Sequence, residues 1–102
     1  MDKKALVTVK KFKQRVQKAF PIEVLVFFGS RSVSEHTKES DIDLIIVSKQ
    51  FQKLNFYKRC AKMYDYWDSR YPVDFICLTP REFQKQKKNS FISTAMEKGT
   101  IV

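Results

Sequence analysis

Three short apolar runs constrain the fold of this chain more than any other feature of its sequence. They lie at residues 22–28, 41–47 and 73–78, and polar residues are confined to the first three positions of each run. Runs of this length and composition are typical of strands that are covered on both faces of a sheet. The chain is therefore expected to form a small sheet.

The segments between these runs have the spacing of amphipathic helices. Residues 4–19 carry apolar side chains at near-helical intervals with basic residues between them, and Pro21 closes this predicted helix. Residues 54–67 form a second, wider apolar stripe. The polar segment 31–40 is expected to be a short helix or a loop.

The most complete helix start in the sequence follows the third apolar run. Thr79 is placed as an N-cap, Pro80 suits the first helical position, and Glu82 completes a capping box. These three residues together predict a helix over residues 80–88.

A last short helix is expected from its cap at Ser90 to its end at Gly99. The element order is then α-β-(α)-β-α-β-α-α. Alternating helices and strands of this kind indicate an α/β domain. A length of 102 residues suits one such domain, which we expect to span residues 1–102.

The net charge of +9 indicates that the partners of this chain are anionic. Nucleotides, nucleic acid and acidic proteins all qualify, and no recognition motif of a nucleic-acid-binding module is present to favour the second. No apolar run approaches the roughly 20 residues of a membrane span, and the basic start lacks the apolar stretch of a signal peptide. We therefore expect a cytoplasmic chain, without a membrane partner.

Two acidic residues open the second apolar run. Asp41 and Asp43 lie two positions apart, so on a strand their side chains point to the same side, roughly 6.5–7 Å apart along the backbone. Neighbouring carboxylates repel each other, and magnesium, which prefers carboxylate oxygens and also holds substrate phosphates, would compensate this repulsion. Asp74, the acid within the third run, is the candidate third ligand.

A Gly-Ser pair ends the first apolar run. Gly29 would let the backbone approach a triphosphate closely, and Ser30 would donate hydrogen bonds to its oxygens. Taken singly, a Gly-Ser pair is usually a turn, and an Asp-x-Asp is often a solvated strand end. Their combination on three successive strands is far more specific.

This combination resembles the signature of the DNA polymerase beta-like nucleotidyltransferase superfamily. The resemblance lies in Phe28-Gly29-Ser30-Arg31 and in Ser40-Asp41-Ile42-Asp43-Leu44, and it is closest to the minimal nucleotidyltransferases that act as antitoxins of HEPN-domain toxins. It implies a small mixed sheet flanked by helices. It also implies one or two magnesium ions on Asp41, Asp43 and Asp74 as catalytic acids, and a nucleoside triphosphate such as ATP on Gly29, Ser30 and Arg31.

The loop after this motif departs from the family pattern. Minimal members usually carry a small residue, an arginine and a glycine there, where this chain has Ser32, Val33 and Ser34. Arg31 and Lys38 are the candidates to replace the missing arginine. Activity is therefore less firmly implied than the fold.

Three functions remain open from the sequence. The first is transfer of AMP from ATP to a protein hydroxyl, expected to be a tyrosine of a HEPN-like toxin. The second is a non-catalytic antitoxin that occludes its toxin. The third is nucleotidyl transfer to a small molecule or an RNA end, for which this length leaves no acceptor domain. The sequence leaves the base, the acceptor and any oligomeric state open.

Overall fold

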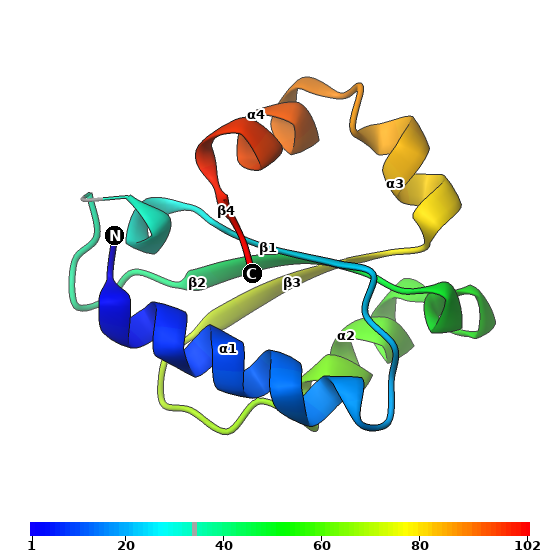
Figure 1. Cartoon of the computed structure of the whole chain (residues 1–102), viewed down its shortest axis with the longest axis horizontal. Helices are drawn as coiled ribbons and strands as arrows, with labels where there is room; N and C mark the ends of the chain where they lie inside the picture. The colour runs from blue at the N-terminus through cyan, green and yellow to red at the C-terminus, as the bar shows by residue number, and fades with distance from the viewer. Residues whose placement is uncertain (34) are drawn as a thin grey trace.

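The computed structural model describes residues 1–33 and 35–102, which form a four-stranded sheet with helices on both faces (Figure 1). The sheet order is β3-β2-β1-β4, in which β2 and β3 are parallel and the other two neighbouring pairs are antiparallel. The predicted α/β class with a small mixed sheet is confirmed. The strands are β1 (Val24–Phe28), β2 (Ile42–Val47), β3 (Val73–Leu78) and β4 (Thr100–Ile101).

Helical elements connect the strands. Within the described residues they are α1 (Lys3–Gln17), η1 (Ser30–Ser32), η2 (Lys49–Lys53), α2 (Phe56–Tyr64), α3 (Pro80–Gln86) and α4 (Ser90–Lys98), where η marks a short 3-10 helix. No helix in the described part of the chain is both long enough and apolar enough to cross a membrane.

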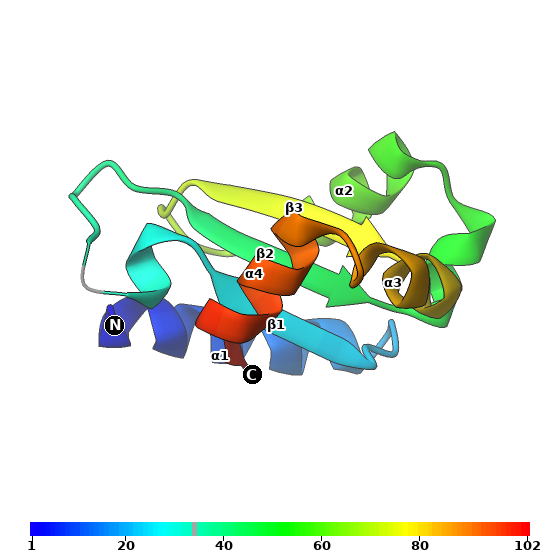
Figure 2. The same ribbon diagram turned by 90° about the horizontal axis from the view of Figure 1, so that it is seen from above.

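Two helical layers sandwich the sheet: α1 and α2 cover one face, and α3 and α4 cover the other (Figures 1 and 2). Side chains alternate along each strand, so Leu44 and Ile46 pack toward α1 and α2, whereas Ile45 and Val47 pack toward α3 and α4. Both faces of β2 are therefore buried, which explains its unbroken apolar run.

The helix boundaries follow the sequence signals with local corrections. The capping box at Thr79 and Glu82 forms as predicted. The N-cap of α4 is Asn89, which accepts a hydrogen bond from the Phe91 N–H, and Ser90 is the first helical residue rather than the cap. The helix predicted over residues 54–67 is shorter at both ends, because Asn55 is its N-cap and α2 ends at Tyr64, and a separate 3-10 helix lies before it.

The two-residue strand β4 is absent from the sequence prediction. It pairs antiparallel with β1 directly after Gly99. A side chain at Gly99 would place its Cβ 2.5 Å from the carbonyl oxygen of Ala95 and 2.9 Å from that of Phe27. Because glycine lacks this atom, the end of α4 can lie directly on β1.

Side chains of α2 bind the outer edge of β3. Tyr64 donates to the carbonyl of Val73 at 2.7 Å, Cys60 to that of Phe75 at 3.6 Å, and Arg59 to that of Cys77 at 3.2 Å. The buried Arg59 also pairs with Glu82 of α3 at 2.7 Å. These contacts fix α2 to β3 and to α3.

Candidate functional site

Asp43 and Asp74 lie opposite each other on the parallel strands β2 and β3. Each is the second residue of its strand, so both lie at the same end of the sheet. By the alternation along each strand they point toward the face that α3 and α4 cover. Asp43 is half-buried and Asp74 is exposed, which places the pair at the open rim of this face.

Asp41 precedes β2 and joins this pair. Burial, followed by the negative charges of Asp74 and Asp41, raises the pKa of Asp43 to about 6. Burial and the adjoining carboxyl group of Asp41 also raise the pKa of Asp74. The three acids that the sequence predicted as metal ligands therefore lie together, and their catalytic and metal-binding roles stay predictions.

The donor chemistry of this acid cluster, Asp41, Asp43 and Asp74, fits a hard divalent cation that also binds substrate. Among the described residues, no three acidic, histidine or cysteine side chains form a ready-made metal site. Magnesium, however, is usually held by one or two carboxylates together with substrate phosphates and water. The cluster supplies such carboxylates, and phosphate oxygens would complete the coordination.

Only glycine fits at position 29, because of the backbone angles there and because Asp43 occupies the space of a side chain. Its φ of 84° and ψ of −169° lie in a region that is essentially restricted to glycine. A Cβ built on Gly29 would overlap the carboxylate of Asp43. The structure thus gives a reason for this glycine that differs from the close approach to phosphate predicted from the sequence.

Ser30 begins the short helix η1 and lines a cavity of about 330 Å³. The cavity lies between the end of β1 with η1 on one side and α4 on the other, and it contains Gly29 in its wall. The Ser30 hydroxyl forms no hydrogen bond with any group in the described part of the chain. It is therefore free to bind a ligand beside the acid cluster.

Ser30→Ala is expected to weaken binding of magnesium and ATP modestly without changing the fold. The variant loses one hydroxyl donor, which is worth about 0.5–1.5 kcal/mol. Calorimetric titration measures this loss against Ser93→Ala, a change at an exposed serine of α4 outside the cavity. Equal affinities for the two variants would remove Ser30 from the site.

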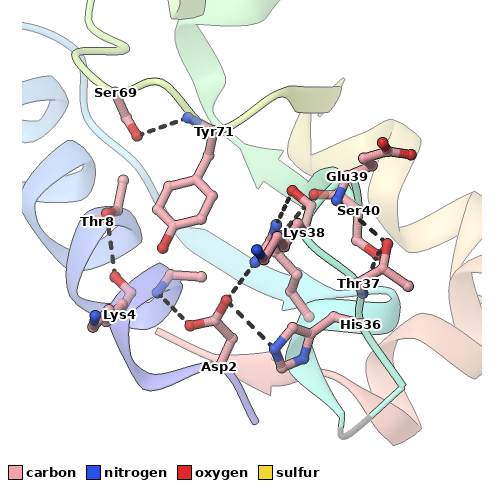
Figure 3. A network of polar contacts seen from close by, with 12 residues as sticks. Asp2, Lys4, Thr8, His36, Thr37, Lys38, Glu39, Ser40, Ser69 and Tyr71 are labelled. Atoms are coloured by element: carbon pink, nitrogen blue, oxygen red, sulfur yellow. Dashed lines mark hydrogen bonds and ion pairs between the residues drawn. The ribbon is translucent and has the colours of Figure 1, made fainter.

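The Arg31 side chain is engaged within the protein. It is 5% exposed, and its guanidinium pairs with Asp2 at 2.5 Å. The guanidinium also donates to the carbonyls of Ser40 at 2.6 Å and Lys38 at 3.1 Å. It lies 4.8 Å from the ring centroid of Tyr71. Figure 3 shows Asp2, Lys38, Ser40 and Tyr71 within one network of polar contacts. These contacts hold the loop that leads into the acid cluster.

A phosphate-binding role for Arg31 stays a prediction, and the structure provides a different role for this side chain. Lys38, the other candidate, lines a separate cavity of about 270 Å³ with Arg70 and Tyr71. Val33 lines the cavity beside Ser30, and Ser34 lies outside the described residues.

Asp2 organises this loop and was not among the residues predicted from the sequence. It caps α1 by accepting a hydrogen bond from the Ala5 N–H at 3.0 Å, and its other oxygen pairs with Arg31. His36 lies 3.9 Å from the same carboxylate. An aspartate directly before a helix is a recognisable cap, but its pairing with a residue 29 positions away has no local signal.

Several known proteins are similar to this chain. The family model of the nucleotidyltransferase domain matches residues 9–102. A protein of Methanocaldococcus jannaschii named as a candidate protein adenylyltransferase is 27% identical over 97 residues, covering 92% of this chain and 94% of that protein.

Solved structures provide a second comparison. The crystal structure of a candidate nucleotidyltransferase from Sulfolobus solfataricus superposes with a TM-score of 0.67 at 28% identity, covering 82% of this chain and 75% of the other. BolA1 from Arabidopsis thaliana has a TM-score of 0.58 at 22% identity, covering 74% of this chain and 94% of the other, and shares the fold alone.

Proposed function

Since this chain belongs to the nucleotidyltransferase domain family, we propose that it moves AMP from ATP to a protein hydroxyl. The observation that carries the proposal is the meeting of Asp41, Asp43 and Asp74 beside Gly29 and Ser30 at one end of the sheet. The name of the Methanocaldococcus relative supports a protein as the acceptor.

Each part of the site has a task in this reaction. Asp41, Asp43 and Asp74 would hold one or two magnesium ions, and bound magnesium supplies charge neutralisation for the phosphates and the attacking oxygen. Ser30 binds the phosphate chain. Asp74, the exposed acid, would accept the proton of the acceptor hydroxyl. The acceptor oxygen then bonds to the α-phosphorus as the bond to the departing pyrophosphate breaks.

The proposed acceptor is a tyrosine of a HEPN-like helical toxin, which this chain would block as an antitoxin. The net charge of +9 supports an acidic partner. Phe56 and Tyr57 of α2 are 59% and 89% exposed, and aromatic side chains are enriched at protein interfaces. Tyrosine also suits a shallow site, because its hydroxyl stands far from its backbone.

In the experiment, the purified chain is mixed with ATP, magnesium and the protein that the adjacent reading frame encodes. We expect intact-mass spectrometry to find ~329 Da added to that protein, the mass of one AMP unit in this phosphoryl-type chemistry. The addition should disappear with Asp43→Asn and without magnesium.

A non-catalytic antitoxin is the second candidate function. It is favoured by the engagement of Arg31 with Asp2, because the described part of the loop after Ser30 then presents no free guanidinium to a phosphate. The same mixture separates the two functions. Neutralisation of the toxin without a mass change, and unaltered in Asp43→Asn, would establish occlusion and exclude AMP transfer to this partner.

A further inference from the structure

We propose that the cavity between η1 and α4 is the nucleotide pocket, in which Lys98 binds the triphosphate and Phe91 contacts the base. This inference rests on the proposed function and deepens it. The cavity volume of about 330 Å³ lies within the range of roughly 300–1,000 Å³ for small-molecule sites. Gly29 forms part of its wall and touches Asp43, so the cavity adjoins the acid cluster.

One face of α4 lines this cavity. Phe91, Thr94, Ala95 and Lys98 are spaced by three, four and seven residues from the first, which places them on the same side of the helix. The packing of Gly99 against β1 fixes the end of α4 directly after Lys98. The position of Lys98 is thus set by the fold rather than by a flexible loop.

The triphosphate needs a cation in this cavity. The acid cluster is itself negative, and Arg31 is occupied by Asp2. Lys98 is the cation and Glu35 the acid in the described lining of the cavity, and Lys98 forms no ion pair within the described residues. A lysine binds phosphate as a point charge, so it can take the part that an arginine of the loop plays in other family members.

The base needs an apolar surface beyond the phosphates. Phe91 is 56% exposed and packs edge-on against Phe28, with ring centroids 5.8 Å apart. Phe28 precedes Gly29 in the cavity wall, so the two rings form an apolar end beside the phosphate-binding turn. Exposed aromatic rings of this kind stack on bases of any sequence.

The test distinguishes residues that bind the triphosphate from residues that contact the base. Affinities of the full chain for ATP and for inorganic tripolyphosphate, both with magnesium, are measured by competition against a fluorescent ATP analogue. Lys98→Ala should weaken both ligands by about tenfold or more, the usual effect of losing a charged hydrogen bond, and Lys98→Arg should retain binding. Phe91→Ala should weaken ATP by about tenfold and leave tripolyphosphate unchanged.

Lys88→Ala is the matched control, because Lys88 is exposed between α3 and α4 and outside the cavity. If wild type binds ATP and Lys98→Ala binds it as tightly as Lys88→Ala does, the pocket is overturned and the proposed function stands. If Phe91→Ala weakens both ligands equally or neither, the base contact is overturned. Absence of ATP binding by wild type would overturn the proposed function as well.

Discussion

Asp43→Asn is expected to lower AMP transfer by about 100- to 1,000-fold, the usual loss when one electrostatic contact to a reacting group is removed. Asp43 interacts with the charges of both Asp41 and Asp74, so its replacement removes one of the three carboxylates that meet at the site. Labelled ATP measures the transfer. Asp68→Asn, a change at an exposed acid after α2, is the matched control and should keep full activity.

The same variant should be more stable than wild type at neutral pH without magnesium. The pKa of Asp43 is about 6 in the folded chain and about 3.9 when unfolded. Ionisation is therefore harder in the folded state, so wild type loses stability as the pH rises through this interval, whereas the Asp43→Asn variant does not. In thermal melts, Asp43→Asn should have the higher melting temperature at pH 7, and the two proteins should melt at the same temperature near pH 3.

With magnesium, wild type should be more stable than the Asp43→Asn variant. The ion stabilises the protein that it binds, and the variant lacks one of its carboxylate ligands. Full transfer activity in Asp43→Asn would contradict the catalytic assignment. Equal melting temperatures at pH 7 without magnesium would contradict the raised pKa of Asp43, which burial and the charges of Asp74 and Asp41 cause.

Gly29→Val should be the most disruptive single change at the turn formed by Gly29 and Ser30. Its backbone angles cost a non-glycine residue about 1–3 kcal/mol, and the overlap of its side chain with Asp43 adds about 1–3 kcal/mol of overpacking. We expect the free energy of unfolding to fall by about 2–6 kcal/mol, and ATP binding to be lost because the turn and Asp43 are both displaced.

A double-mutant cycle separates the two causes. Gly29→Ala suffers both backbone strain and the overlap with the carboxylate of Asp43. In an Asp43→Ala background the carboxylate is gone, and the strain remains with one contact of 3.3 Å to the Cβ of residue 43. Urea unfolding should therefore show a coupling energy of about 0.5–3 kcal/mol. Additive effects would show that the contact with Asp43 is not what excludes a side chain at Gly29. ATP binding by Gly29→Val at the wild-type affinity would move the phosphate site elsewhere.

The sequence predicted the elements whose signals are local. β3 has the predicted bounds of residues 73 and 78, and the capping box at Thr79 forms because all its partners lie within four residues. The nucleotidyltransferase fold, which the motif around Gly29 and Asp43 implied, is confirmed. β4 was missed, because two residues cannot show a periodicity and their pairing with β1 depends on tertiary packing.

The sequence predicted which residues belong to the candidate site, but not the tertiary contacts that they make. The sequence named Asp74 as the third acid from the strand next to that of Asp43, and the parallel register of β2 and β3 is what sets the two residues opposite each other. The overlap that excludes a side chain at Gly29 is a contact between the end of β1 and β2. The engagement of Arg31 depends on Asp2, and the placement of Lys98 depends on how α4 crosses β1. None of these contacts has a sequence pattern of its own.

The side chains of α2 along β3 also determine how this protein can meet others. An uncovered edge strand invites another chain to extend the sheet, which leads to aggregation or to peptide binding by strand addition. Here Arg59, Cys60 and Tyr64 already occupy three carbonyls of that edge. An incoming polypeptide therefore finds no row of free acceptors along the described part of β3, so a protein that binds at this edge would do so through side chains rather than by extending the sheet.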